Sequence, residues 1–384
     1  MRTLTILALA VSGLGACVDH QAPITGTQSL EIKLTSPANA GDINNRLPDT
    51  ARAVSFTITA KDADGNVDTT FSNSLQVYAH YLGTLTPYLG GTPLATVSMN
   101  AGMGTVSLTL PPVFGPTTVW FDDFADGDSA TYATGISPTL WFRDPFLADI
   151  QTPANEMSVD ALDAAPLDNK NIDVRASRYG AQGRLVVTSV YTQGYTLADV
   201  KCADANGTPP CVAGDYDYMD VFSYSAPLDQ DKRFLSEGQL IDGFAGGVTE
   251  FDSLTEIGFP QTFVVGQPVI NKAAEPAPRV VDPTWFQTPI NFERVEGGLI
   301  EIDNAFVCPL DDDYITYKQW KLDLDGLGAN CSGNNVINVV TAGTLDLDPA
   351  TLSGKTLPKL VAISRPIFKH WIVFPRSMSD LTLP

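Results

Sequence analysis

The segments Gly183-Arg184-Leu185-Val186-Val187-Thr188-Ser189-Val190-Tyr191 and Gly194-Tyr195-Thr196-Leu197-Ala198-Asp199 decide how the second half of this chain folds. The first is rich in β-branched residues and ends in an aromatic residue, so it is predicted to be a strand. The second follows almost immediately and is its expected partner. Strands rather than helices should therefore organise this half of the chain.

Working outward, further strands are predicted at Met219–Tyr224, Gly238–Phe244, Gly246–Phe251 and Leu254–Ile257. This order, which includes a Gly-Tyr-Thr-Leu-x-Asp segment and ends in Thr-Glu-Ile, resembles the OB-fold modules found beside secreted bacterial nucleases. The resemblance covers residues 170–260 and departs from the usual pattern at Tyr195 and at a cysteine-containing insertion. It implies an OB-like β barrel, which we place at residues 156–262.

A Pro-rich stretch, residues 263–290, is expected to link this unit to a second OB-like β unit at residues 291–384. The ending Phe374-Pro375-Arg376-Ser377, with Asp380-Leu381, resembles the closing strand of OB-like units in secreted bacterial lipoproteins. The second half should hold either two barrels or one barrel whose halves interlock. Helices are expected only as short turns, for example after Asp348-Pro349.

The first half also has a strand pattern. Val54–Ala60 alternates apolar and polar residues with period two, as a half-buried strand requires. The run Phe56–Asn66 resembles bacterial immunoglobulin-like surface domains, so residues 29–142 are predicted to form an immunoglobulin-like sandwich, followed by a linker at 143–155. The expected fold class is all-β: one sandwich, then one or two OB-like barrels.

The start of the chain has the features of an export signal. Met1-Arg2-Thr3 precedes an apolar run, and the run leads to Leu14-Gly15-Ala16-Cys17, which resembles the lipobox of bacterial lipoproteins. The resemblance implies a signal peptide at 1–16, acylation of Cys17 and a lipidated tether at 17–28. Because Val18 rather than Asp follows the cysteine, the expected location is the outer membrane and, as a further option, the cell surface.

Composition limits the partners. The chain of 384 residues is 44% hydrophobic and carries a formal charge of −21, so it can form sizeable cores and repels nucleic acid at long range. Partners are therefore expected to be the membrane, through the lipid, and an envelope protein or glycan.

The remaining cysteines are Cys202, Cys211, Cys308 and Cys331, an even number that suits disulfides in an oxidising compartment. Three pairings are possible, of which Cys202–Cys211 with Cys308–Cys331 is the simplest. Zinc is disfavoured because the chain has no Cys-x-x-Cys pair and only three histidines.

Two groups of residues are candidates for binding. The carboxylates of the acidic group repel one another, and either a calcium ion or solvent would relieve this repulsion. The second group would bind a ligand if its members share a concave face. The acidic group is Asp311, Asp312, Asp313, Asp323 and Asp325, and the second group is Tyr195, Phe222 and Arg376.

No catalytic residues are assigned, because the chain lacks a Gly-x-Ser-x-Gly elbow and has few histidines to serve a nucleophile. The function expected from sequence is a membrane-tethered, non-catalytic binding or structural lipoprotein. The alternative is an accessory protein or hydrolase that acts on extracellular nucleic acid or glycan, with calcium as a possible cofactor.

The lipid anchor gives a first prediction. A Cys17→Ser variant should move from the membrane fraction to the soluble fraction, because serine cannot accept the acyl chains whose buried methylenes hold the protein at the bilayer. Cell fractionation and immunoblotting measure this, and retention of the variant in the membrane would contradict the assignment.

Overall fold

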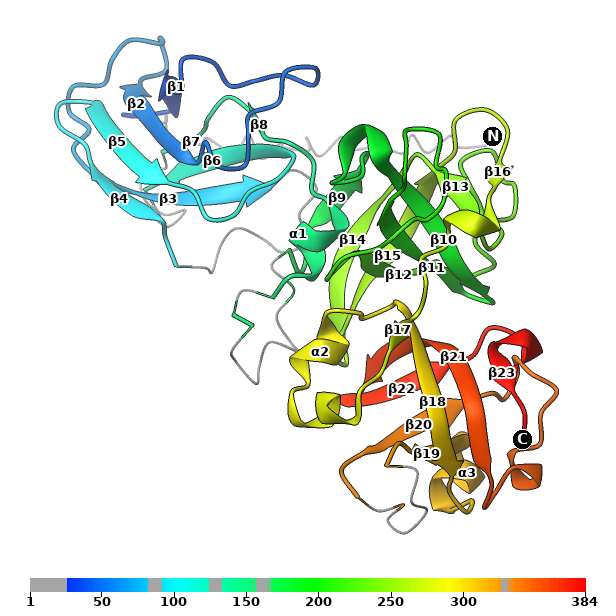
Figure 1. Cartoon of the computed structure of the whole chain (residues 1–384). Helices are drawn as coiled ribbons and strands as arrows, with labels where there is room; N and C mark the ends of the chain where they lie inside the picture. The colour runs from blue at the N-terminus through cyan, green and yellow to red at the C-terminus, as the bar shows by residue number, and fades with distance from the viewer. Residues whose placement is uncertain are drawn as a thin grey trace, which may run out of the picture.

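The computed structural model describes residues 26–81, 92–123, 133–153, 155–156, 165, 167–325, 331 and 333–384. Cys17 and most of the expected signal and tether lie outside the described residues. The described chain is all-β, as predicted, and forms a sandwich followed by two barrels (Figure 1). No helix in the described ranges is long and apolar enough to cross a membrane.

The N-terminal sandwich has two antiparallel sheets. Its buried strand positions alternate as the sequence predicted, so that Phe56 and Phe121 from opposite sheets meet with ring centroids 5.6 Å apart. The first sheet contains β1 (Ser29–Ser36), β2 (Ala53–Lys61) and β5 (Met103–Thr109). The second sheet contains β3 (Ser74–Tyr81), β4 (Ala95–Ser98), β6 (Pro116–Asp122), β7 (Thr134–Ile136) and β8 (Leu140–Trp141).

The first barrel is built on the hairpin that opened the sequence analysis. Its central strands pair in the order β10-β11-β12-β15-β14, and β12 runs parallel to β15. The sheet returns on itself because β13 pairs with β10 and continues past Asp242 into β14. The strands are β9 (Asn171–Val174), β10 (Gly183–Tyr191), β11 (Gly194–Lys201), β12 (Tyr218–Phe222), β13 (Gln239–Ile241), β14 (Gly243–Phe251), β15 (Leu254–Phe263) and β16 (Val269–Ile270).

The second barrel is closed and repeats this order. Its five main strands pair as β18-β19-β20-β22-β21, β20 runs parallel to β22, and β21 returns to β18. The strands are β17 (Arg279–Val280), β18 (Leu299–Val307), β19 (Gln319–Asp323), β20 (Val336–Val340), β21 (Thr356–Ile367), β22 (His370–Phe374) and β23 (Leu381–Thr382). Since each unit completes its own circuit, the second half contains two barrels and not one interlocked barrel.

Disulfides and short helices complete the two barrels. Cys202 pairs with Cys211 and Cys308 with Cys331, the simplest of the predicted pairings. The helices are α1 (Leu147–Gln151), α2 (Ile290–Glu293) and α3 (Asp312–Tyr317), with 3-10 turns η2 (Gly180–Gln182), η3 (Lys272–Ala274), η4 (Pro283–Gln287), η5 (Pro349–Thr351) and η6 (Met378–Asp380). The turn expected after Asp348-Pro349 is η5, and the Asp348 side chain accepts from the Ala350 amide.

Both segments that the sequence analysis assigned to linkers make packed contacts. Within 143–155, α1 buries Leu147 and Ile150 in the core of the first barrel. Within 263–290, β16 extends the sheet of the first barrel and β17 pairs with β18 of the second.

The two barrels share an apolar junction. In β11 and β12 the inward residues, such as Leu197 and Met219, fill the first barrel, whereas the outward Ala198, Val200 and Tyr218 belong to the core cluster of the second. The first seven residues of β11 are therefore buried on both faces of the sheet. Gly298 permits this close approach, because a Cβ there would lie 2.7 Å from the ring of Tyr218.

A buried ion pair lies beside this apolar contact. Arg365 of β21 reaches the first barrel, where its Nε lies 2.6 Å from Asp220 Oδ2. The Tyr191 hydroxyl donates to the other oxygen of Asp220 at 2.5 Å, and the guanidinium lies 4.2 Å from the centre of the Tyr191 ring. The single arginine thus joins a strand of each barrel and compensates a carboxylate that solvent does not reach.

The junction gives the second prediction. An Arg365→Ala variant should lose about 3–5 kcal/mol of unfolding free energy, because it leaves the buried Asp220 carboxylate without its charge partner. The matched control is Arg175→Ala, which removes an exposed ion pair with Asp173 and should cost about 0–1 kcal/mol. Urea unfolding of both variants measures the difference, and equal losses would show that the junction pair is not structural.

Candidate functional site

The outer face of the second barrel at β19, β20 and β22 is open, in contrast to the covered face of the first. Alternation turns Trp320, Leu322, Ile337 and Val339 into the core. The intervening residues therefore face outward, and they form the floor of a cavity of about 510 Å³. That volume lies in the range of small-molecule and oligomer sites.

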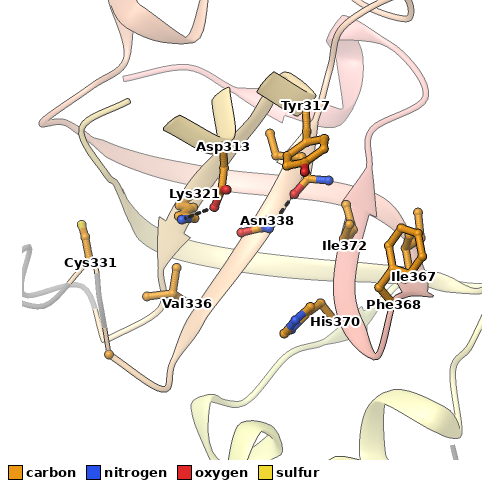
Figure 2. Close-up of a pocket in the computed structure, with 12 residues that line it drawn as sticks. Asp313, Tyr317, Lys321, Cys331, Val336, Asn338, Ile367, Phe368, His370 and Ile372 are labelled. Atoms are coloured by element: carbon orange, nitrogen blue, oxygen red, sulfur yellow. Dashed lines mark hydrogen bonds and ion pairs between the residues drawn. The ribbon is translucent and has the colours of Figure 1, made fainter. Parts of the chain in front are cut away.

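Two chain segments border the cavity, as Figure 2 shows. On one side lies α3, with Asp313 and Tyr317, and on the other the turn between β21 and β22, with Phe368. Cys331 lies at a third edge, where its disulfide to Cys308 fixes the described part of the loop before β20. In OB-folds this strand face and the loops beside it are where oligonucleotides and oligosaccharides bind.

A smaller hollow of about 240 Å³ adjoins the cavity and shares Val336, Asn338 and His370 with it. We call these two adjoining hollows together the groove. The groove is lined by Asp313, Tyr317, Gln319, Lys321, Cys331, Gly333, Val336, Asn338, Ile367, Phe368, His370 and Ile372 in the cavity, and by Phe286, Asn334, Lys369 and Trp371 in the smaller hollow.

Polar side chains at the centre of the groove are fixed by mutual contacts. The Asn338 side-chain nitrogen donates to Gln319 Oε1 at 2.7 Å, from one strand to its neighbour. Lys321 Nζ lies 2.6 Å from Asp311 Oδ2 and 2.6 Å from Asp313 Oδ2. These contacts hold the groups in place before a ligand arrives.

The acidic group for which calcium or solvent was expected forms separate local contacts in the structure. Asp311 caps α3 and accepts a hydrogen bond from the Asp313 amide. The pKa of Asp311 is lowered because Lys321 donates a hydrogen bond to its carboxylate. Asp312 lies in the first turn of α3, Asp323 accepts from the Asp325 amide, and Asp325 accepts from Asn335. Within the described ranges, no three histidine, cysteine, aspartate or glutamate side chains converge as metal ligands would.

The predicted ligand residues Tyr195, Phe222 and Arg376 do not share a concave face. Tyr195 is fully buried inside the first barrel, where its hydroxyl lies 2.7 Å from Thr262 Oγ1, so it cannot stack on a ligand at the surface. Phe222 lies on the other face of the sheet and packs edge-on against Tyr224. The ligand-binding surface that required these three residues together is thus not formed.

Arg376 has a structural contact set. Its guanidinium donates to Glu275 and to Asp380, and Nη1 donates to the backbone oxygen of Thr188 in the first barrel at 2.8 Å. It is therefore a second arginine that joins the barrels, and little of it faces solvent.

Sequence reasoning missed the residues that form the groove, above all Gln319, Asn338, Tyr317 and Phe368. A signal existed in the strands: Gln319-Trp320-Lys321-Leu322 and Val336-Ile337-Asn338-Val339 alternate, which marks one outward set with polar members. What the pattern could not give is that these two sets lie side by side beneath an exposed turn.

A second cluster of titratable groups lies near the barrel junction and is buried. Burial, together with the charge of Asp220, raises the pKa of Glu256 to about 7 against the opposing effect of Arg365. Burial also raises the pKa of Glu296 well above its usual value, and Glu293 and Glu250 add to this shift. One oxygen of Glu296 accepts from the Thr255 amide at 2.9 Å. Burial thus favours the neutral form of both acids at the junction.

In comparisons with known proteins, no family model, no curated protein and no solved structure matches this chain.

The buried acids give the third prediction. The pKa of Glu256 in the folded state, about 7, lies above its ordinary value. At pH values between the two, the folded state binds more protons than the unfolded state, so the free energy of unfolding falls as pH rises through about 7. Melting temperature should therefore fall from pH 5 to pH 8, and Glu256→Gln should flatten this fall.

Asp199, whose pKa burial also raises to about 7, should keep part of the slope in that variant. Glu31→Gln, on the exposed edge of β1, is the control and should leave the slope unchanged. A melting temperature that rises over this range would contradict the assignment.

Proposed function

We propose that this protein is a lipid-anchored, non-catalytic binding protein of the bacterial envelope, and that its ligand binds in the groove of the second barrel. The observation that carries the proposal is the open β19-β20-β22 face, whose fixed polar groups and exposed rings lie between α3 and the β21–β22 turn. A concave face with few, preorganised polar groups is typical of binding sites.

Export is supported by two features of different kinds. The segment Leu14-Gly15-Ala16-Cys17 resembles a lipobox, and the four remaining cysteines form two disulfides, which persist in oxidising compartments such as the bacterial periplasm. We place the lipid at the outer membrane, with the sandwich as the spacer or docking surface that separates it from the barrels.

A binding role fits the groove better than hydrolysis. Asp313 is the one carboxylate among the described residues that line the cavity, and it forms an ion pair with Lys321. Hydrolysis of a glycosidic bond normally takes two carboxyl groups, one on each side of the scissile bond. Asp311, the nearest further carboxylate, is paired with the same lysine as Asp313, so the described residues do not place two free acids on opposite sides of a bound chain.

Site-specific crosslinking provides the test and the fourth prediction. Phe368 borders the groove and Phe234 lies on the first barrel, and both are 71% exposed, so they form a matched pair. With p-benzoylphenylalanine at either position of the full chain, irradiation of cells should give an adduct at 368 and none at 234. Equal adducts at the two positions, or none at 368, would refute the groove as the binding site.

A further inference from the structure

The groove also indicates what kind of molecule it binds. We infer that its ligand is an uncharged glycan chain; this inference rests on the function proposed above and narrows it. The two hollows adjoin and share three lining residues, so a ligand that fills both is longer than a single ring. Three properties of the groove select a sugar chain: its charge, its hydrogen-bonding groups and its rings.

The charge of the groove does not favour a polyanion. Lys321 is held between Asp311 and Asp313 at 2.6 Å from each, and these two carboxylates offset the two lysines of the groove, Lys321 and Lys369. The whole chain carries −21. Single-stranded nucleic acid needs the reverse, a positive groove that follows the backbone.

The hydrogen-bonding groups match hydroxyls. Asn338 and Gln319 use one donor and one acceptor on each other, which leaves the pair with further N–H groups and carbonyl lone pairs toward the groove. A sugar hydroxyl both donates and accepts, so it can satisfy such a mixed pair, whereas an anion can use only the donors.

The rings supply flat apolar surfaces at two borders of the cavity. Tyr317 is 66% exposed and Phe368 is 71% exposed, and Figure 2 shows them apart, Tyr317 above Asn338 and Phe368 at the far right. Covering the exposed apolar surface of such rings is favourable, and the C–H face of a pyranose ring is an apolar surface that can cover them. Aromatic rings flanking amides are thus suited to a chain of sugar rings.

A peptide strand is the competing occupant, and the barrel gives it no open edge at the groove. β19, β20 and β22 each pair on both sides within the closed circuit, so a peptide cannot add to them by backbone hydrogen bonds. Side-chain contacts alone would have to hold it.

Calorimetry on the purified full chain in detergent tests the inference. Cellohexaose and chitohexaose are the uncharged probes, and a heparin oligosaccharide and oligo-dT are the anionic probes. At least one uncharged probe should bind more tightly than both anionic probes. Tyr317→Ala and Phe368→Ala should each weaken the binding of that uncharged probe about tenfold, as loss of an aromatic anchor does. Phe251→Ala, an exposed phenylalanine at the end of β14 in the first barrel, is the control and should bind as the unaltered chain does.

The outcomes separate the two proposals. Tighter binding of heparin or oligo-dT, or uncharged binding that the two ring variants do not weaken, overturns the glycan assignment. If the crosslink at 368 forms in cells but neither hexasaccharide binds at millimolar concentration, the glycan assignment fails while the groove stands. If the crosslink is also absent, both proposals fail.

Discussion

The contact between the two barrels is the constraint on which the rest of the structure depends. The outward residues Ala198, Val200 and Tyr218 of β11 and β12 are apolar and lie under the second barrel, and Arg365 compensates the carboxylate of Asp220 beside them. Burial of apolar area drives this contact, and the ion pair fixes which strands face each other, since a misplaced arginine would leave a buried charge without a partner. One OB-like face is thereby used for assembly, and the equivalent face of the other barrel is left open.

The open face is well suited to hold a ligand because its supports are rigid. Its polar residues project from strands that pair on both sides, and the disulfide to Cys308 holds the described part of one bordering segment. Little ordering is needed on binding, so less of the contact energy is lost to side-chain entropy. The buried acids of the junction, Glu256 and Glu296, do not line the cavity. Their protonation therefore changes the stability of the protein rather than the chemistry of the groove.

Much of the fold could be predicted from the sequence and the site could not. Alternation in segments such as Val54–Ala60 located strands, and the short separations within each cysteine pair favoured the pairing that the structure has. Alternation says which residues share a face, but not whether that face is core, junction or surface. Tyr195 was assigned to a ligand for this reason and lies in the core, and Arg376 was assigned to a ligand and joins the barrels. The acidic group around Asp311 was judged without Lys321, which only the pairing of β19 beside α3 brings to it.

The covered face of β11 and β12 also has a consequence for biogenesis. In a chain that emerges amino end first, the first barrel appears before β18, β21 and β22. During that interval Ala198, Val200 and Tyr218 form an apolar surface that is exposed to solvent. Such surfaces cause misassembly of multidomain chains. Closure of the carboxyl-terminal strands over this surface must therefore outpace encounters between nascent copies, or a holdase must shield the surface until they arrive.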